Sequence, residues 1–185
     1  MTVKVAIVFH SEAGHTKAIA EYIKIGADKI GHATLYDCKS DFKVDDLNDS
    51  DAIIFGCPTY MGSVSGELKL FMEKSSSAWS KQAWRNKIAA GFTDSAALNG
   101  DKLSTLMQIS IFALQHGMIW VGLDLFAGIS NSKSDPNSMN RLGSWMGLIS
   151  QSNTDQACAP QCDMETAEYF GERIATMARN FRSNI

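Results

Sequence analysis

The sequence predicts an α/β fold, an open and doubly wound sheet of five parallel strands with helices on both faces. Short apolar runs, typical of strands buried on both faces, alternate with segments whose apolar residues recur at helical spacing. Turns rich in small, hydroxyl-bearing or glycine residues follow three of these runs. In such a sheet those turns lie at the carboxyl ends of the strands, where ligands bind.

The elements follow one another in the order β-α-β-β-α-β-α-β-α, within a single domain spanning residues 1–185. The predicted strands are 3–9, 33–37, 52–57, 87–93 and 118–122, and the predicted helices are 16–30, 68–81, 103–114 and 164–180. The acidic stretch 41–51 replaces a helix and is expected to be a solvated connection. Residues 124–162 are mostly small and polar, apart from the apolar stretch Gly143–Ile149. They form a long inserted loop of the kind that carries function or partner contacts.

The overall composition argues against two classes of protein. A net charge of −3 with no basic face disfavours nucleic-acid binding, and no apolar run approaches the roughly 20 residues that span a bilayer. The N-terminus enters a strand pattern without the marks of a signal peptide, so a cytoplasmic location is expected. The four cysteines are then expected to be reduced thiols, with a reversible bridge or a metal between Cys158 and Cys162 as alternatives. No metal site is predicted.

The loop after the first strand has the features of a phosphate site. It reads Ser11-x-x-Gly14-x-Thr16 and leads directly into a helix, so that N–H groups and two hydroxyls face one point. It lacks the lysine of a Walker A loop and the repeated glycines of a dinucleotide turn. Glu12 is expected to turn outward, because a carboxylate would repel a phosphate. The alternative is an ordinary capped helix.

Two motifs resemble those of known flavoproteins. Ser11-Glu12-Ala13-Gly14-His15-Thr16 resembles the phosphate loop of flavodoxin-like proteins, although Ala13 stands where that pattern has a hydroxyl. The stretch Gly56–Gly66 is similar to the G-x-P-T-x-x-G-x-x-x-G loop of WrbA-type NAD(P)H:quinone oxidoreductases. The likeness extends over residues 3–123 and implies a flavodoxin-like sheet with strand order 2-1-3-4-5.

The resemblance also implies the ligands and the residues that bind them. FMN is the expected cofactor and NAD(P)H the expected co-substrate. The implied phosphate-binding residues are Ser11, Glu12, Ala13, Gly14, His15 and Thr16. The implied ring-binding residues are Pro58, Thr59, Tyr60, Met61 and Gly62 on one side and Thr93, Asp94, Ser95, Ala96 and Ala97 on the other. Tyr60 is a flat aromatic neighbour for the ring, and His116 matches a family histidine near the flavin of the same or another subunit; both are candidate catalytic residues.

Several histidines and tryptophans have simpler expected roles. His10 is expected to pack, and His15 to contribute its backbone N–H, while His32 is expected at the surface. The four tryptophans are expected in the core or at an interface, with Trp145 able to reach a pocket in this or another subunit.

The expected function is an FMN-dependent oxidoreductase that transfers electrons from NAD(P)H to quinones or similar small acceptors. A homodimer or homotetramer is implied by the family likeness. The first alternative is a flavodoxin-type electron carrier that docks on redox proteins, although such carriers are strongly acidic whereas this chain is only mildly so. The second is a flavodoxin fold without flavin that serves as a binding module.

Overall fold

The fold is built on one sheet of parallel strands whose main path runs β2-β1-β3-β4-β5. The structure is a computed structural model and describes residues 2–127 and 131–182. The strands of this path are β1 (Lys4–Phe9), β2 (His32–Asp37), β3 (Ala52–Pro58), β4 (Ile88–Ser95) and β5 (Ile119–Trp120). The predicted doubly wound sheet and its strand order are confirmed.

A sixth strand, β6 (Leu148–Gln151), lies inside the segment predicted as a long loop. β5 pairs with the start of β4, at Ile88 and Ala89, and β6 pairs with the end of the same edge, from Phe92 to Ser95. The chain therefore leaves this edge after β5 and returns to it at β6. Burial of Leu148 against the sheet explains why the apolar stretch near 143–149 comes back to the core.

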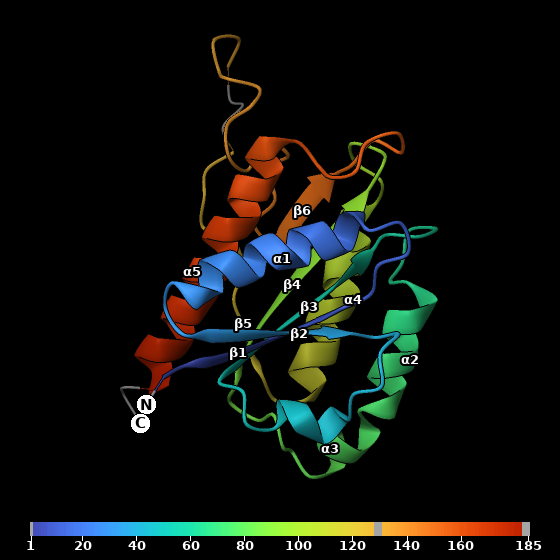
Figure 1. Cartoon of the computed structure of the whole chain (residues 1–185), viewed down its shortest axis with the longest axis vertical. Helices are drawn as coiled ribbons and strands as arrows, with labels where there is room; N and C mark the ends of the chain where they lie inside the picture. Colours follow the sequence, from blue (N-terminus) through green and yellow to red (C-terminus); the bar gives the residue numbers. More distant parts are fainter. Residues whose placement is uncertain (1, 128–130, 183–185) are drawn as a thin grey trace.

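Helices cover both faces of the sheet (Figure 1). α1 (His15–Asp28) and α5 (Gln161–Arg182) pack on one face, and α2 (Gly66–Lys74), α3 (Ser76–Ser80) and α4 (Lys102–Gln115) pack on the other. A short 3₁₀ helix, Val44–Leu47, lies in the acidic connection. In Figure 1 the segment around 131–139 projects away from these layers. Within the described ranges, no helix has the length and apolar character needed to cross a membrane.

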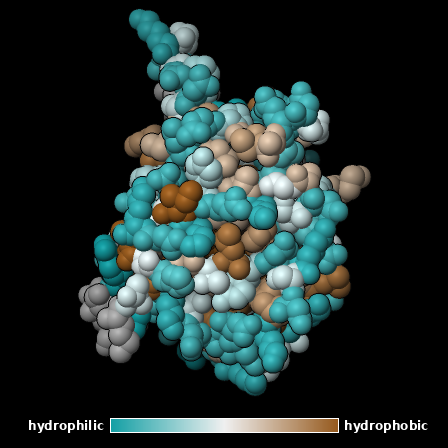
Figure 2. Space-filling model, viewed as in Figure 1, coloured by the Kyte–Doolittle hydropathy of each residue, from teal (hydrophilic) through white to brown (hydrophobic). Residues whose placement is uncertain are grey.

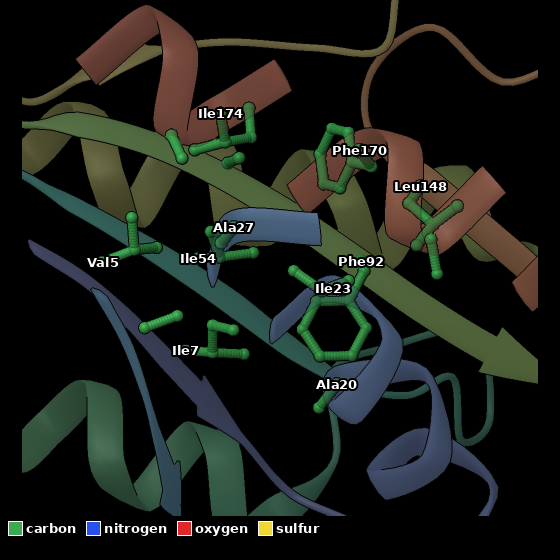
Figure 3. Close-up of a cluster of buried hydrophobic side chains, with 14 of the residues drawn as sticks. Val5, Ile7, Ala20, Ile23, Ala27, Ile54, Phe92, Leu148, Phe170 and Ile174 are labelled. Carbon is green, nitrogen blue, oxygen red and sulfur yellow. The ribbon is translucent and has the colours of Figure 1, made fainter. Parts of the chain in front are cut away.

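The core under α1 and α5 is aliphatic, with Ile7, Ile23, Ile54 and Phe170 among its fully buried members (Figure 3). The two helices approach each other closely at glycines. A Cβ on Gly26 would lie 1.8 Å from the carbonyl oxygen of Glu168, and one on Gly171 would lie 1.9 Å from that of Ile23. Any side chain at these positions would force the helices apart, so the sequence specifies glycine at both.

The core on the other face is aromatic. Phe55, Phe71, Trp84 and Phe112 form a cluster with ring centroids between 5.3 and 6.4 Å apart. The single helix predicted over 68–81 is divided into α2 and α3 at Ser75. The hydroxyl of Ser75 donates to the carbonyl oxygen of Met72 at 2.7 Å, a local bond that competes with continuation of a helix.

Candidate functional site

Three loops meet at the carboxyl ends of β1, β3 and β4, as the strand order requires. Backbone hydrogen bonds fix them side by side: the N–H of His10 donates to Gly56 O at 3.0 Å, and that of Thr59 donates to Asp94 O at 2.8 Å. They enclose a cavity of about 190 Å³, which we call the cradle. It is lined by Ser11, Glu12, Ala13, His15, Thr16, Pro58, Tyr60, Asp94, Ser95, Ala96, Ser152 and Thr154. The cradle is smaller than the about 300–1,000 Å³ that encloses a drug-sized ligand, so a nucleotide would extend over its rim.

The first loop carries backbone donors without partners. Gly14 has φ of 94°, and its N–H donates to Ser11 Oγ at 3.2 Å, which closes the loop. Across the described parts of the chain, no group accepts from the N–H of Ala13, His15 or Thr16, and none bonds Thr16 Oγ1. These donors converge at the N-terminus of α1, where the helix dipole favours an anion. A phosphate fits this donor set.

Acidic and basic side chains of the same loop have partners within the protein. The Glu12 side chain is 61% exposed and pairs with Lys39, which lowers the pKa of the carboxyl group. Glu12 also belongs to the cradle lining, so its orientation away from a bound phosphate stays a prediction. The buried His10 ring packs as predicted, with Nδ1 2.9 Å from Ser65 Oγ. The imidazole of His15 is engaged by the carbonyl oxygen of Gln156, 2.6 Å from Nε2, so this residue can offer a ligand its backbone N–H.

The second loop is a tight turn that presents Tyr60 to the cradle. Tyr60 and Ser63 exchange both backbone hydrogen bonds, and the two residues between them have positive φ, as in a type I′ turn. Pro58 and Tyr60 line the cradle, and the half-exposed Tyr60 ring provides a flat wall at its rim. Met61 and Gly62 lie at the tip of the turn, outside the cradle lining, and Met61 is fully exposed.

Two predicted ring-binding threonines take part in a buried hydroxyl network instead of lining the cradle. Thr59 Oγ1 lies 2.8 Å from both Thr93 Oγ1 and Thr105 Oγ1, and Thr93 Oγ1 donates to Cys57 O at 2.7 Å. The network ties the second loop to β4 and α4. Thr59 and Thr93 therefore position the loops, and their side chains are occupied.

The third loop contributes Asp94, Ser95 and Ala96 to the cradle. Asp94 is buried, and its Oδ1 accepts hydrogen bonds from Ser150 Oγ at 2.7 Å and Ser152 Oγ at 2.9 Å. Burial raises the pKa of this carboxyl group despite those two donors. Ala97 does not line the cradle. Its carbonyl oxygen accepts a hydrogen bond from the buried Lys102 Nζ at 2.6 Å, and this bond holds the third loop against α4.

One wall of the cradle was missed in the sequence. Ser152 and Thr154 follow β6 and line the cavity, with Ser152 Oγ bonded to Asp94 of the third loop. The sequence signal was weak, because Leu148-Ile149-Ser150-Gln151 is two apolar residues followed by two polar ones and lacks the alternation of a half-buried strand. Because β6 pairs with the end of β4, the residues after it reach the same edge as the other loops.

His116 does not reach the cradle of its own chain. It follows α4, whose 14 residues begin beside the third loop and run toward the opposite edge of the sheet, a distance of about 20 Å. There it is buried, stacked on Trp84 with a centroid distance of 4.3 Å, and its Nε2 lies 3.0 Å from Ser75 Oγ. A role at the site of another subunit stays a prediction.

The cysteines lie apart from the cradle and all four are free thiols. Cys158 is exposed and Cys162 is buried. Burial raises the pKa of Cys38 to about 12 and that of Cys57 to about 11, so these thiols are unreactive. Within 2–127 and 131–182, no three His, Cys, Asp or Glu side chains gather as a metal site would need.

Asp94→Asn is expected to stabilise the fold near neutral pH. A raised pKa means that the folded chain holds this proton more tightly than the unfolded chain, so the ionised carboxylate costs stability above the folded pKa. The amide removes that charge and keeps an acceptor for the serine hydroxyls. In urea unfolding we expect the variant to exceed the wild type in unfolding free energy at pH 7, with a gap that narrows toward pH 4.

Asp41→Asn, which changes an exposed carboxylate, is the matched control and should give no such gap. A gap for Asp94→Asn that widens as the pH falls would contradict this account of the buried carboxylate.

Comparison with known proteins agrees with this geometry. Residues 4–131 match the family model described as NADPH-dependent FMN reductase. The chain is 36% identical to flavodoxin FldP of Pseudomonas aeruginosa, over 97% of this chain and 99% of that protein. It is 26% identical to an NAD(P)H dehydrogenase (quinone) of Archaeoglobus fulgidus, over 95% and 97%. The crystal structure of a WrbA-like flavodoxin from Agrobacterium tumefaciens superposes with a TM-score of 0.78 at 35% identity, covering 97% of this chain and 99% of that one.

Proposed function

The chain belongs to the NADPH-dependent FMN reductase family, and we propose that it transfers electrons from NAD(P)H to quinones or similar small acceptors through bound FMN. The observation that carries this proposal is the set of unpartnered N–H groups at the start of α1, which matches a phosphate monoester held without a metal. The family description names FMN and NADPH, the two cofactors expected from the sequence.

The residues of the cradle would each hold one part of the cofactor. The N–H groups of Ala13, His15 and Thr16, with the Ser11 and Thr16 hydroxyls, would bind the phosphate. Tyr60 on one side and Ser95 and Ala96 on the other would flank the ring at the open rim. Bound FMN supplies hydride and electron transfer, and the protein contributes position and electrostatics.

The described cradle lining holds no Lys or Arg, and the His15 imidazole in it is engaged by Gln156 O, which supports a neutral-donor mode of binding. Two lysines near the first loop are paired with glutamates outside the lining positions of the phosphate donors: Lys39 with Glu12, and Lys17 with Glu21. Asp94 adds a carboxylate on the side of the third loop, where it can accept from ligand hydroxyls. Tyr60 stays a neutral phenol, since burial and the nearby Glu12 raise its pKa, so it can donate a hydrogen bond.

A flavodoxin-type electron carrier is the second candidate. The observation in its favour is the name of the relative that shares 36% identity, a flavodoxin. The mild net charge of −3 favours the enzyme, since carriers that dock by charge need a strong field.

The test is to titrate the apoprotein with FMN and then follow NADH and NADPH oxidation with benzoquinone. We expect saturable quenching of FMN fluorescence and turnover well above a blank containing the same free FMN. FMN binding without turnover would reject the reductase in favour of the carrier. A protein that shows no saturable FMN binding would reject both and leave a fold used as a binding module.

A further inference from the structure

A second cavity lies on the other side of the third loop from the cradle. It measures about 670 Å³ and is bounded by that loop, by the start of α4 and by segment 141–149, which runs into β6. We call it the outer cavity. Leu98 and Asn99 line it, whereas Ser95 and Ala96, a few residues earlier, line the cradle. Its volume lies within the about 300–1,000 Å³ that is typical of small-molecule sites.

The walls of the outer cavity are mainly apolar and include exposed side chains. Leu98, Leu103 and Trp145 are between 54% and 66% exposed, and Met146 and Ile149, also in the lining, are partly buried. On the face of α1 and α5, by contrast, exposed apolar side chains are isolated among hydrophilic ones (Figure 2). The exposed indole of Trp145 offers a flat surface on which an aromatic ring can stack.

The backbone that carries Trp145 is held in place by hydrogen bonds. Trp145 O accepts from the N–H of Leu123 at 3.0 Å. The N–H of Ser144 donates to Asn140 Oδ1 at 2.9 Å, and its hydroxyl donates to Gly147 O at 2.7 Å. This wall is therefore preformed, which reduces the ordering cost that a ligand has to overcome.

Arg141 gives the outer cavity an unused hydrogen-bond donor. Its Nε and Nη2 donate to the two carboxylate oxygens of Asp163 at 2.7 and 2.9 Å, and Nη2 also donates to Gln151 Oε1 at 3.3 Å. In the described parts of the chain, no group accepts from Nη1. The side chain is only 14% exposed, and the cavity lining to which it belongs contains no Asp or Glu. An anionic ligand would supply the missing acceptor.

Lys102 adds a buried positive charge to the same lining. The residue is 1% exposed, and its Nζ donates to the carbonyl oxygens of Ala97 at 2.6 Å and Leu98 at 3.1 Å. Among the residues that the structure describes, no carboxylate forms an ion pair with it. Burial lowers the pKa of its ammonium group, which shows that the charge is incompletely compensated. An anion in the cavity would offset the cost of burying this charge.

We propose that the outer cavity binds an aromatic carboxylate. The carboxylate would accept from Arg141 Nη1 close to Lys102, and the ring would pack against Trp145 and the apolar walls. One negative charge fits the site, because Asp163 already balances Arg141 and leaves the charge of Lys102. A neutral aromatic compound would leave the donor unpaired, and an aliphatic acid would not use the flat face of the indole. This proposal does not depend on the cofactor.

The experiment titrates the protein with 2-naphthoate by calorimetry, and with 2-naphthalenemethanol as a neutral probe of similar shape. We expect one naphthoate per chain with a dissociation constant below about 1 mM, and about 10-fold weaker binding of the neutral probe. One equivalent of FMN should leave naphthoate binding unchanged, since the cradle is a separate cavity. A protein that fails to bind FMN would defeat the proposed function, while the naphthoate titration would still test this proposal.

Two variants change exposed walls of the outer cavity and should therefore keep the fold. Trp145→Ala removes the indole and Leu98→Asp adds a carboxylate, and each should weaken naphthoate binding about 5-fold or more. The matched control is Trp79→Ala, which removes an indole on α3 that is 51% exposed and does not line the cavity; it should bind as the wild type does. Arg141→Lys keeps a cation for Asp163 but loses Nη1, so it should weaken binding of naphthoate and not of the neutral probe.

Circular dichroism of each variant checks that it is folded, and the two exposed-wall variants keep the test valid if Arg141→Lys is not. The proposal is overturned if naphthoate shows no saturable binding, if the neutral probe binds equally well, or if FMN displaces naphthoate. Unchanged affinity in both exposed-wall variants, or an equal loss in Trp79→Ala and Trp145→Ala, would overturn it as well.

Discussion

Gly14→Ala is expected to weaken FMN binding about 5- to 30-fold. Gly14 has φ of 94°, and the left-handed region costs a residue with a Cβ roughly 1–2 kcal/mol, which corresponds to that loss of affinity. A Cβ at this position meets no atom within 4 Å, so the effect comes from backbone strain and not from a clash. The loop would relax toward negative φ, and its N–H groups would no longer converge on one phosphate.

Gly66→Ala is the matched control for this prediction. Gly66 begins α2, its φ lies outside the positive region, and a Cβ there also meets nothing within 4 Å. Both variants therefore add a methyl group in open space. They differ in the backbone conformation of the substituted residue, which has positive φ at Gly14 and not at Gly66. Titration of FMN fluorescence should give a weakened dissociation constant for Gly14→Ala and the wild-type value for Gly66→Ala. Equal affinities in all three proteins would mean that the first loop does not hold the phosphate.

The sequence was sufficient to predict the sheet because each strand and helix has its own periodicity. Buried strands such as Ala52–Pro58 are apolar throughout, and α5 repeats its apolar residues at helical spacing. β6 was harder to predict, since four residues inside a long polar segment carry little periodic signal. Its place became visible only in three dimensions, where the edge of β4 beyond β5 offers backbone groups that need partners.

The site was predicted as a set of loops, but the directions of its side chains were not. Position at a strand end placed Thr59 and Thr93 near the cofactor, whereas their hydroxyls bond each other, and that of Thr59 also contacts Thr105 Oγ1. The position of His116 relative to the site could not be predicted from the motif alone. α4 begins beside the third loop and runs away from the site, so His116, which follows its last residue, lies at the far edge of the sheet. A motif match gives the place of this histidine in the sequence but not its distance from the site.

His116 is expected to make stability depend on pH between about 6.5 and 4. Burial lowers the pKa of its imidazole from 6.5 to about 4, so the unfolded chain binds a proton in this range more readily than the folded chain does. Stability is then complete above the unfolded pKa and declines as the pH falls. A difference of this size corresponds to about 3 kcal/mol at the acid end. The measurement is the free energy of urea unfolding at pH 7, 5.5 and 4 (roughly spanning the two pKa values).

The hydrogen bonds around the ring explain the cost of protonation. Ser75 Oγ donates its proton to Met72 O, so we assign the His116 proton to Nε2, which donates to Ser75 Oγ. Nδ1 is buried and has no partner among the described residues. A proton on Nδ1 would add a charge between Trp84 and Phe112 with no acceptor to receive it.

His116→Gln keeps an N–H donor for Ser75 and cannot be protonated, so it should remove most of this pH dependence while other acidic groups still titrate. His32→Gln, at an exposed histidine, should retain the wild-type profile. The quantity to compare is the unfolding free energy of the two variants. As the pH falls, that of His116→Gln should increase relative to that of His32→Gln. Parallel profiles for the two variants would contradict a buried neutral His116, and would reopen the question of why this ring stacks on Trp84 at the edge opposite the cradle.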